Sequence, residues 1–133
     1  MVSAKFIFSL AAFAAAATAA PVDSQPEAHL EKRSYSGRAT YYQAGMGNCG
    51  WKNTGADKIV ALNTAQYGST SDQSEHCGKK VRIHHNGQTQ TATVADSCPT
   101  CNYGSLDMSK SLFGALTNDN FDLGEFQMTW EFV

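Results

Sequence analysis

The second half of the chain carries the pattern of a β-hairpin. Residues 80–86 alternate between apolar and polar side chains, which is the period of a half-buried strand. Asn86-Gly87 then supplies the dipeptide that best fits a tight turn between two antiparallel strands, and residues 88–95 continue the alternation. We therefore predict a hairpin over residues 80–95.

Three further stretches have strand character and one has helix character. Residues 34–42 and 59–62 are rich in aromatic or β-branched side chains, and residues 126–132 alternate apolar with polar side chains. Residues 109–116 instead place their apolar side chains on one side of a short helix, with Ser109 in the N-cap position. The chain has 11 glycines and only 17% charged residues, which favours turns and short strands over a helical bundle. We expect a mainly β fold, a small closed barrel with one or two short helices.

The beginning of the chain has the pattern of an export signal. Lys5 precedes an apolar run over residues 6–17, and small residues follow at Ala17-Thr18-Ala19. A membrane span takes about 18 or more apolar residues, which this run does not reach. We predict a signal peptide over residues 1–19, and hence a secreted, extracellular protein with no membrane attachment in its mature form.

Residues 20–33 are polar, lack periodicity and end in Lys32-Arg33. Such a segment cannot bury enough apolar surface to offset its ordering entropy. It resembles a pro-peptide that a kexin-type protease removes after the dibasic pair, and a flexible linker with a chance pair is the alternative. We expect one folded domain over residues 34–133.

Four cysteines constrain that domain. An even number in a secreted chain indicates disulfides, and Cys49, Cys77, Cys98 and Cys101 allow three pairings. Cys98 and Cys101 can close a tight loop, which would leave Cys49 and Cys77 as a long staple worth roughly 3–4 kcal/mol in the loop-entropy model. A thioredoxin-like redox site and a four-cysteine zinc site are disfavoured, because Cys98 follows a strand and Cys49 lies far from Cys77 in sequence.

Charge and histidine placement argue against several partners. The chain carries 10 Lys and Arg against 12 Asp and Glu, a net charge of −2 at pH 7, so it lacks the bulk positive charge of a nucleic-acid-binding domain. His84 and His85 are adjacent on a predicted strand, so their side chains point to opposite faces, a poor geometry for a metal site. We expect no nucleic-acid partner, no metal and no cofactor.

A series of sequence blocks, in order along the chain, resembles a known family. The blocks are residues 37–42 (GRATYY), 47–50 (GNCG), 59–63 (IVALN), 77–81 (CGKKV), 94–101 (VADSCPTC), 105–109 (SLDMS) and 128–130 (MTW). The series resembles the RlpA-like double-psi β-barrel family, which includes barwins and expansins, and is similar in particular to the short single-domain loosenins of fungi. The resemblance spans residues 35–133 and implies a six-stranded, disulfide-stapled barrel with a shallow open groove for polysaccharide.

The resemblance also implies a candidate catalytic residue. The Asp of the family's Leu-Asp-Leu-Ser block lines the groove and is needed for activity, and it corresponds to Asp107. A carboxyl among apolar neighbours can have a raised pKa and donate a proton to a glycosidic oxygen. The alternative for Asp107 is a turn or helix-cap carboxylate ahead of Ser109.

Further residues are expected to contact substrate. Asp96 and Thr40 match a groove carboxylate and a groove hydroxyl of the family, with an Asx-turn and ordinary strand propensity as their alternatives. Tyr42, Tyr103 and Trp51 have rings that can stack on sugars, although aromatic residues more often belong to a core.

Hydrolysis requires a second carboxyl group. In inverting glycosidases a base carboxylate lies about 6.5–9.5 Å from the acid. The related endoglucanases carry that base just after the aromatic pair of the first strand, where this chain has Gln43 or Ala44, and an amide cannot accept the proton from water. We expect no strong glycosidase activity, with lytic cleavage by Asp107 alone as a minor alternative.

The sequence thus predicts a monomeric, expansin-like protein whose partner is cell-wall polysaccharide, either glucan, cellulose or chitin. It would loosen this polymer without strong hydrolysis. The alternative is a small secreted barrel that inhibits cysteine proteases or acts on a host as an effector.

Overall fold

The computed structural model describes residues 33–68 and 73–133, so the predicted signal peptide and all of the predicted pro-peptide except Arg33 lie outside the described residues. The strands are β1 (Ser34–Tyr41), β2 (Ile59–Asn63), β3 (Lys80–His85), β4 (Gln88–Cys98), β5 (Leu106–Met108) and β6 (Phe126–Phe132). The helices are α2 (Thr64–Tyr67), α3 (Lys110–Thr117) and the short 3-10 helix η2 (Phe121–Leu123).

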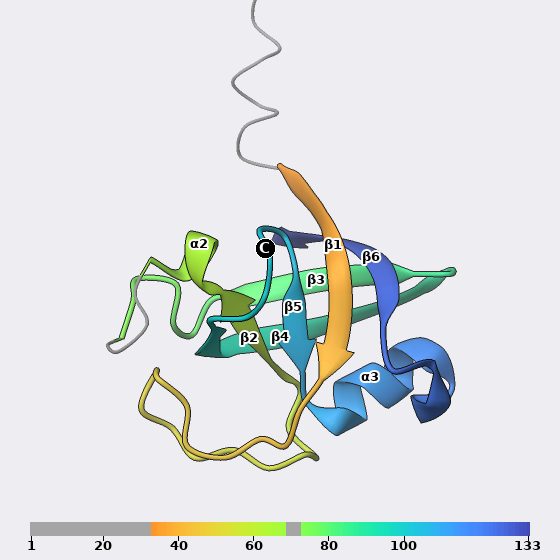
Figure 1. Cartoon of the computed structure of the whole chain (residues 1–133), viewed down its shortest axis with the longest axis horizontal. Helices are drawn as coiled ribbons and strands as arrows, with labels where there is room; N and C mark the ends of the chain where they lie inside the picture. The colour runs from red at the N-terminus through yellow and green to blue at the C-terminus, as the bar shows by residue number, and fades with distance from the viewer. Residues whose placement is uncertain (1–32, 69–72) are drawn as a thin grey trace, which may run out of the picture. The chain divides into compact units, whose positions relative to one another are not determined.

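The six strands close into a barrel in the order β1-β5-β2-β4-β3-β6. β1 pairs with β5, and β2 with β4, in parallel, while the other neighbouring strands are antiparallel. Figure 1 shows β1 and β5 side by side, with β3 and β4 behind them. The predicted mainly β, six-stranded barrel with short helices is confirmed.

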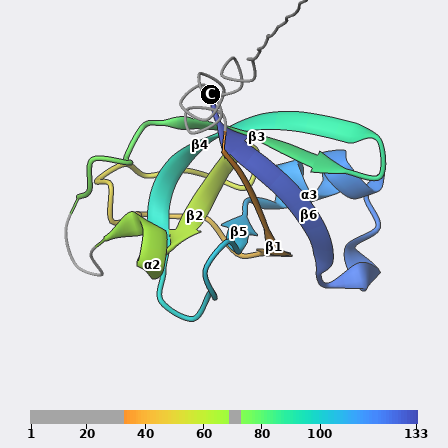
Figure 2. The same ribbon diagram turned by 90° about the horizontal axis from the view of Figure 1, so that it is seen from above.

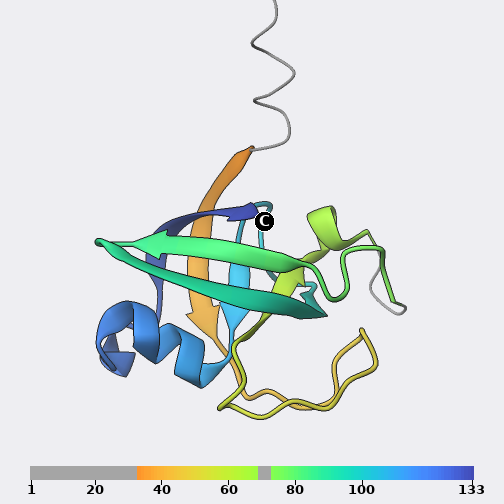
Figure 3. The same cartoon turned by 180° about the vertical axis from the view of Figure 1, so that it is seen from behind.

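The predicted hairpin is present as β3 and β4, joined by Asn86-Gly87. Both turn residues have positive φ, 48° at Asn86 and 82° at Gly87, which is the backbone of a type I′ turn. Val81 and Ile83 are fully buried and Arg82 is exposed, as the alternation predicted. Figure 3, from behind, shows the two long strands crossing the near side of the barrel.

β5 is the strand that periodicity did not indicate. It has 3 residues, too few for an alternating pattern to be recognised. Leu106 and Met108 point inward and are fully buried, so Asp107 between them stands on the outer face. β5 lies between β1 and β2 and pairs with both, and this places the Asp107 side chain beside residues of distant sequence segments.

α3 seals part of the barrel interior. Leu112, Phe113 and Leu116 are buried on its inner side, which packs against β1, β3 and β4. Figure 2 shows α3 and α2 on opposite sides of the barrel. Apolar helix side chains at this spacing form the stripe that the sequence predicted for this segment.

Ser109 occupies the predicted N-cap position of α3 but makes no side-chain cap hydrogen bond. Its hydroxyl instead accepts a hydrogen bond from the Ile59 N–H at 3.3 Å, which ties the start of α3 to β2. The predicted N-cap position is confirmed, while a tertiary contact rather than the helix uses the hydroxyl.

Two glycines allow the chain to cross itself beside β1. A Cβ atom on Gly37 would collide with the carbonyl of Gly104, and one on Gly104 would collide with the carbonyl of Ser36. The Trp130 indole N–H donates to the Gly104 carbonyl at 2.9 Å and fixes the crossing from inside the barrel. A side chain at either position would push β1 and the β4–β5 connection apart.

Two disulfides complete the fold. Cys49 bonds Cys77 with a sequence separation of 28, and Cys98 bonds Cys101 with a separation of 3. This resolves the open question of pairing in favour of one tight loop and one long staple. Two disulfides in one small domain are typical of proteins from oxidising compartments. Within the described residues, every helix is too short or too polar to cross a membrane.

Candidate functional site

A row of side chains crosses four strands on the outside of the barrel, and we call it the acidic row. Strand register aligns its members in the order Thr40 on β1, Asp107 on β5, Ala61 on β2 and Asp96 on β4. Two strand spacings separate the carboxylate-bearing strands, so the Cα atoms of Asp107 and Asp96 lie about 9–10 Å apart. The small Ala61 side chain lies between the two carboxylates.

Asp107 is half-buried and hydrogen-bonded. The Thr40 hydroxyl donates to Asp107 Oδ1 at 2.9 Å across the parallel β1–β5 pair. Burial raises the pKa of the Asp107 carboxyl above its ordinary value, while hydrogen bonds from Thr40 and the Met108 amide lower it and the nearby Asp96 charge raises it further. The result is a carboxyl that takes up a proton more readily than an exposed Asp.

Asp96 is held by backbone amides. Its Oδ1 accepts hydrogen bonds from the N–H groups of Asn48 and Ser97, both at 2.8 Å. The loop between β1 and β2 approaches so closely that a Cβ atom on Gly47 would collide with the Ala95 carbonyl. These bonds differ from the Asx-turn named as the alternative for Asp96, since they join its carboxylate to the next residue and to a distant loop, and they hold the carboxylate in the acidic row.

Tyr42 joins the acidic row at its edge. Its N–H donates to the Met108 carbonyl at 2.9 Å, which continues the β1–β5 contact by one residue. Burial, followed by the negative charges of Asp96 and Asp107, raises the pKa of the Tyr42 phenol. The phenol is therefore a neutral hydrogen-bond donor close to both carboxylates.

A pocket of about 440 Å³ opens beside Tyr42. Its lining includes Tyr41, Gln43 and Lys110, whose Nζ lies 5.1 Å from the Phe121 ring centre. Sequence reasoning did not select Lys110, because it was assigned only to a helix. It also missed Asn48, although residues 47–50 form one of the sequence blocks quoted above.

The other two predicted aromatics lie differently: Tyr103 is distant from the acidic row, and Trp51 belongs to the loop beside Asp96. Tyr103 is 59% exposed and makes an edge contact with Tyr35, at the opposite end of β1 from Thr40. At about 3.3 Å per residue, Tyr35 and Thr40 are roughly 16 Å apart along the strand. Trp51 is 44% exposed and lies in the loop that covers Asp96, where it faces Gly78. The described residues contain no cluster of three His, Cys, Asp or Glu side chains able to hold a metal ion.

A second hollow, larger than the pocket beside Tyr42, lies away from the acidic row. It has a volume of about 670 Å³ and is formed by β6 and the β3–β4 hairpin, with Ser36 of β1 at its edge. The hollow with the larger volume therefore lies on one part of the barrel, and the Asp107 carboxyl and Tyr42 phenol, whose pKa values are raised, lie on another. We place the candidate site at the acidic row, because the functional groups of a site, rather than its volume, determine what it can bind or react with.

Comparisons with known proteins show the family of the chain. No family model matches the chain. The allergen Asp f 7 of Aspergillus fumigatus is 39% identical over 72% of this chain, which spans only 36% of the allergen. The papain inhibitor of Streptomyces mobaraensis is 30% identical over 74% of this chain and 71% of its own length. The chain belongs to the RlpA-like double-psi β-barrel family.

Solved structures of this family superpose on the barrel. A Streptomyces papain inhibitor has a TM-score of 0.68 at 30% identity, covering 76% of this chain and 94% of the inhibitor. A mutant Clavibacter michiganensis expansin in complex with cellohexaose has a TM-score of 0.65 at 28% identity, covering 76% of this chain and 50% of the expansin. The family thus includes proteins named for two different activities on the same barrel.

Proposed function

We propose that this double-psi barrel binds cell-wall polysaccharide along the acidic row and loosens contacts between polymer chains without strong hydrolysis. The observation that carries the proposal is the alignment of Thr40, Asp107 and Asp96 in one row on the outer face, with the Tyr42 phenol beside both carboxylates. The expansin complex with cellohexaose supports a glucan as ligand.

The chemistry of the row suits sugar hydroxyls. Carboxylates accept hydrogen bonds from sugar hydroxyl groups, while the neutral Tyr42 phenol donates a hydrogen bond to a sugar oxygen. The Asp107 carboxyl accepts when it is ionised and donates when it is protonated, and its raised pKa increases the protonated fraction at the pH of acidic walls. A polymer chain bound in this way exchanges its hydrogen bonds with neighbouring chains for bonds with the protein, and the neighbouring chains separate.

Strong hydrolysis is not expected from this arrangement. Gln43 and Ala44, which stand where related endoglucanases have their base, line the pocket beside Tyr42 and cannot accept a proton from water. Asp96 is held by two backbone N–H groups across Ala61 from Asp107. We propose that Asp107 anchors the polymer and that Asp96 shapes the surface.

The test is retention on insoluble cellulose, β-glucan and chitin by the wild type and by Asp107→Asn. We expect the wild type to be retained by at least one polymer and to weaken its fibres, and Asp107→Asn to fold normally and lose both effects. Asp122→Asn, which changes an exposed carboxylate outside the row, is the matched control and should behave as wild type. Equal activity of Asp107→Asn and wild type would contradict the role of Asp107. Sustained release of reducing ends would contradict the absence of hydrolysis.

Inhibition of a cysteine protease is the second candidate, favoured by the similarity to papain inhibitors over most of both chains. The β1–β2 loop presents Met46, 69% exposed, and Trp51, and the Cys49–Cys77 bond restrains it. A restrained loop with exposed apolar side chains loses little entropy on entering a protease cleft. A papain assay with stoichiometric protein decides between the candidates. If the second function is correct, Trp51→Ala reduces inhibition. Tyr103→Ala, which removes another exposed aromatic ring, is the control and leaves inhibition unchanged.

Secretion and a monomeric state belong to the same proposal. Both disulfides suit an oxidising compartment, as an extracellular wall protein requires. Size-exclusion chromatography with light scattering, on protein recovered from culture medium, would check both.

A further inference from the structure

A second row of polar side chains crosses the outside of the barrel, over β1, β6, β3 and β4, and we call it the hydroxyl row. Strand register aligns Ser36 with Thr129, Thr129 with His84, and His84 with Thr89. The row shares β1 and β4 with the acidic row but none of its residues. On β4, Thr89 and Asp96 lie about 23 Å apart along the strand at about 3.3 Å per residue.

The hollow of about 670 Å³ lies over the hydroxyl row and the hairpin turn. Besides the row, its polar lining comes from His85, Asn86, Gln88 and Gln127. Among the described residues that line it there is no Asp, Glu, Lys or Arg. Its chemistry is therefore that of hydroxyl, amide and imidazole groups, which both donate and accept hydrogen bonds.

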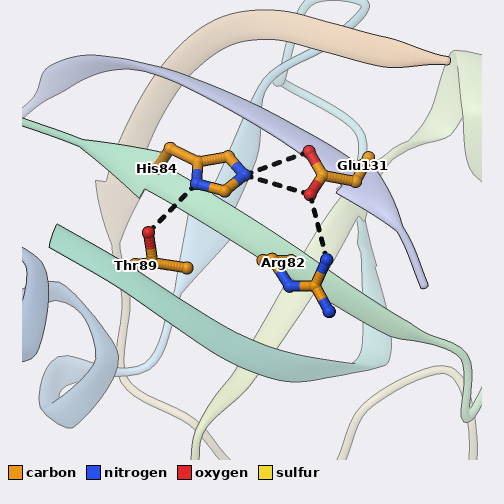
Figure 4. A network of polar contacts seen from close by, with 4 residues as sticks. All are labelled: Arg82, His84, Thr89 and Glu131. Carbon is orange, nitrogen blue, oxygen red and sulfur yellow. Dashed lines mark hydrogen bonds and ion pairs between the residues drawn. The ribbon is translucent and has the colours of Figure 1, made fainter. Parts of the chain in front are cut away.

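His84 is held in one orientation by the contacts shown in Figure 4. Its Nε2 lies 3.1 and 3.0 Å from the two carboxylate oxygens of Glu131, and its Nδ1 lies 3.1 Å from the Thr89 hydroxyl oxygen. A carboxylate only accepts, so Nε2 carries a hydrogen, and Nδ1 exchanges a hydrogen bond with the Thr89 hydroxyl, which can both donate and accept. Arg82 Nη1 lies 3.6 Å from Glu131 Oε2, so the guanidinium and the carboxylate balance each other beside the hollow.

His85 is held as well, with the opposite polarity. Its Nδ1 lies 2.9 Å from the Gln127 carbonyl oxygen, and its ring centre lies 4.0 Å from that of Phe126. Because a carbonyl only accepts, Nδ1 is the donor, and Nε2 is the ring nitrogen left for a ligand. The hollow thus has an oriented imidazole at its edge in addition to the hydroxyls of the row.

We propose that this hollow is a second glycan-binding site, which takes the uncharged, hydroxyl-rich face of a polysaccharide chain. Sugar hydroxyls need donors and acceptors at short intervals, and neighbouring strands present such groups about 4.5–5.5 Å apart. The histidines are fixed before the ligand arrives, so little side-chain entropy is lost on binding. An anionic ligand fits less well, because the nearby Arg82 is already paired with Glu131.

Two sites on one barrel give a mechanism for loosening, and this part rests on the proposed function of the acidic row. One polymer chain binds the acidic row and another binds the hydroxyl row, so the barrel stands between them. Binding of the second chain is then favoured by the high effective concentration of neighbouring chains in a wall.

The test is a titration of the ¹⁵N-labelled protein with cellohexaose, and separately with chitohexaose and laminarihexaose, followed by amide chemical shifts. We expect two sets of shifts with separate affinities, one at residues 84–89 and 127–129 and one at residues 40–42, 96 and 107. The variant Ser36→Ala/Thr89→Val should weaken the first set by about fivefold for each hydroxyl removed and leave the second set unchanged. The control Ser34→Ala/Thr91→Val makes the same changes on the same strands, one outward position away from the hollow, and should bind as wild type.

The outcomes separate the two proposals. Shifts only at the acidic row overturn the second site and leave the proposed function standing. Shifts only at the hollow support the second site and overturn the acidic row as a glycan site. Shifts at neither set with any of the three hexasaccharides overturn both, and an equal loss in the control variant overturns the second site.

Discussion

The acidic row and the hydroxyl row ring the same barrel but are assembled differently. Thr40 and Asp107 are separated by 67 positions in sequence and meet through parallel pairing, and the β1–β2 loop covers Asp96 at the other end of the row. In the hydroxyl row, His84 and Thr89 face each other across a hairpin, with Thr89 exposed and His84 partly exposed, while Ser36 and Thr129 join them through backbone pairing alone. Long-range packing therefore alters the chemistry of the acidic row, while the hydroxyl row keeps the hydrogen-bonding character of its residue types. The following changes test that difference.

The largest expected effect comes from the staple that holds the β1–β2 loop. Cys49→Ala/Cys77→Ala should lower the free energy of unfolding by about 3–4 kcal/mol in the loop-entropy model, against about 2 kcal/mol for Cys98→Ala/Cys101→Ala. Because the first pair restrains the loop that bonds Asp96, hydrogen exchange should accelerate at the Asn48 amide and remain slow in β3. Urea unfolding and amide exchange measure both effects. Equal acceleration of hydrogen exchange at the amides of both rows would show that the two rows do not differ in their dependence on long-range packing.

Loss of the Thr40 hydroxyl comes next. Thr40→Val removes the donor to a half-buried carboxyl and should cost about 1–2 kcal/mol of stability. It should also raise the pKa of Asp107 further, since that hydrogen bond lowers it. Thr91→Val, on the exposed face of β4, is the control and should change stability by less than about 0.5 kcal/mol. Urea unfolding and carboxyl-carbon NMR titration measure the two quantities, and an unchanged Asp107 pKa in Thr40→Val would argue against the hydrogen bond.

The pH dependence of stability is a third test of the difference between the two rows. Burial raises the folded-state pKa of Asp107 above its unfolded value, so folding favours the protonated carboxyl. The stability contributed by Asp107 is present in full below its unfolded pKa and is lost as the pH rises through the raised pKa. The stability of Asp107→Asn relative to wild type should therefore increase from about pH 3 to about pH 7. Thermal unfolding across this range measures the change, and a constant difference would contradict the raised pKa.

The smallest effect is expected in the network beside the hydroxyl row. The Arg82 side chain is 48% exposed and lies 3.6 Å from Glu131, so Arg82→Gln should change stability by no more than about 0.5 kcal/mol. Urea unfolding measures this difference. A loss above about 1 kcal/mol would mean that this outer face, like the acidic row, depends on packing.

The sequence and the structure agree where signals are local. The hairpin followed from alternation and Asn86-Gly87, and the apolar side of α3 followed from its spacing. β5 escaped because 3 residues cannot show a period, and its place between β1 and β2 depends on contacts with both. The bond from the Ile59 N–H to the Ser109 hydroxyl could not be predicted for the same reason, since Ile59 is distant in sequence.

The residues of the candidate site likewise divide into those that were selected from the sequence and those that were missed. Asp107, Asp96 and Thr40 were selected through family resemblance and Tyr42 for its ring. The structure brings these four together, although their roles stay predictions. Tyr103 and Trp51 were selected for their rings, and a ring type carries no information on its distance from a carboxylate in the fold. Asn48 was missed because a backbone N–H has no sequence signature.

The crossing of Gly37 and Gly104 has a consequence for engineering. Any graft that adds bulk at this point forces two segments of backbone to part, so the crossing tolerates no added volume. The β1–β2 loop lies elsewhere, and a Cβ atom on Gly45 would have no atom beyond its chain neighbours within 4 Å. A side chain placed at residue 45 would therefore carry a label or a surface attachment without disturbing the crossing, which makes this barrel suitable for immobilisation.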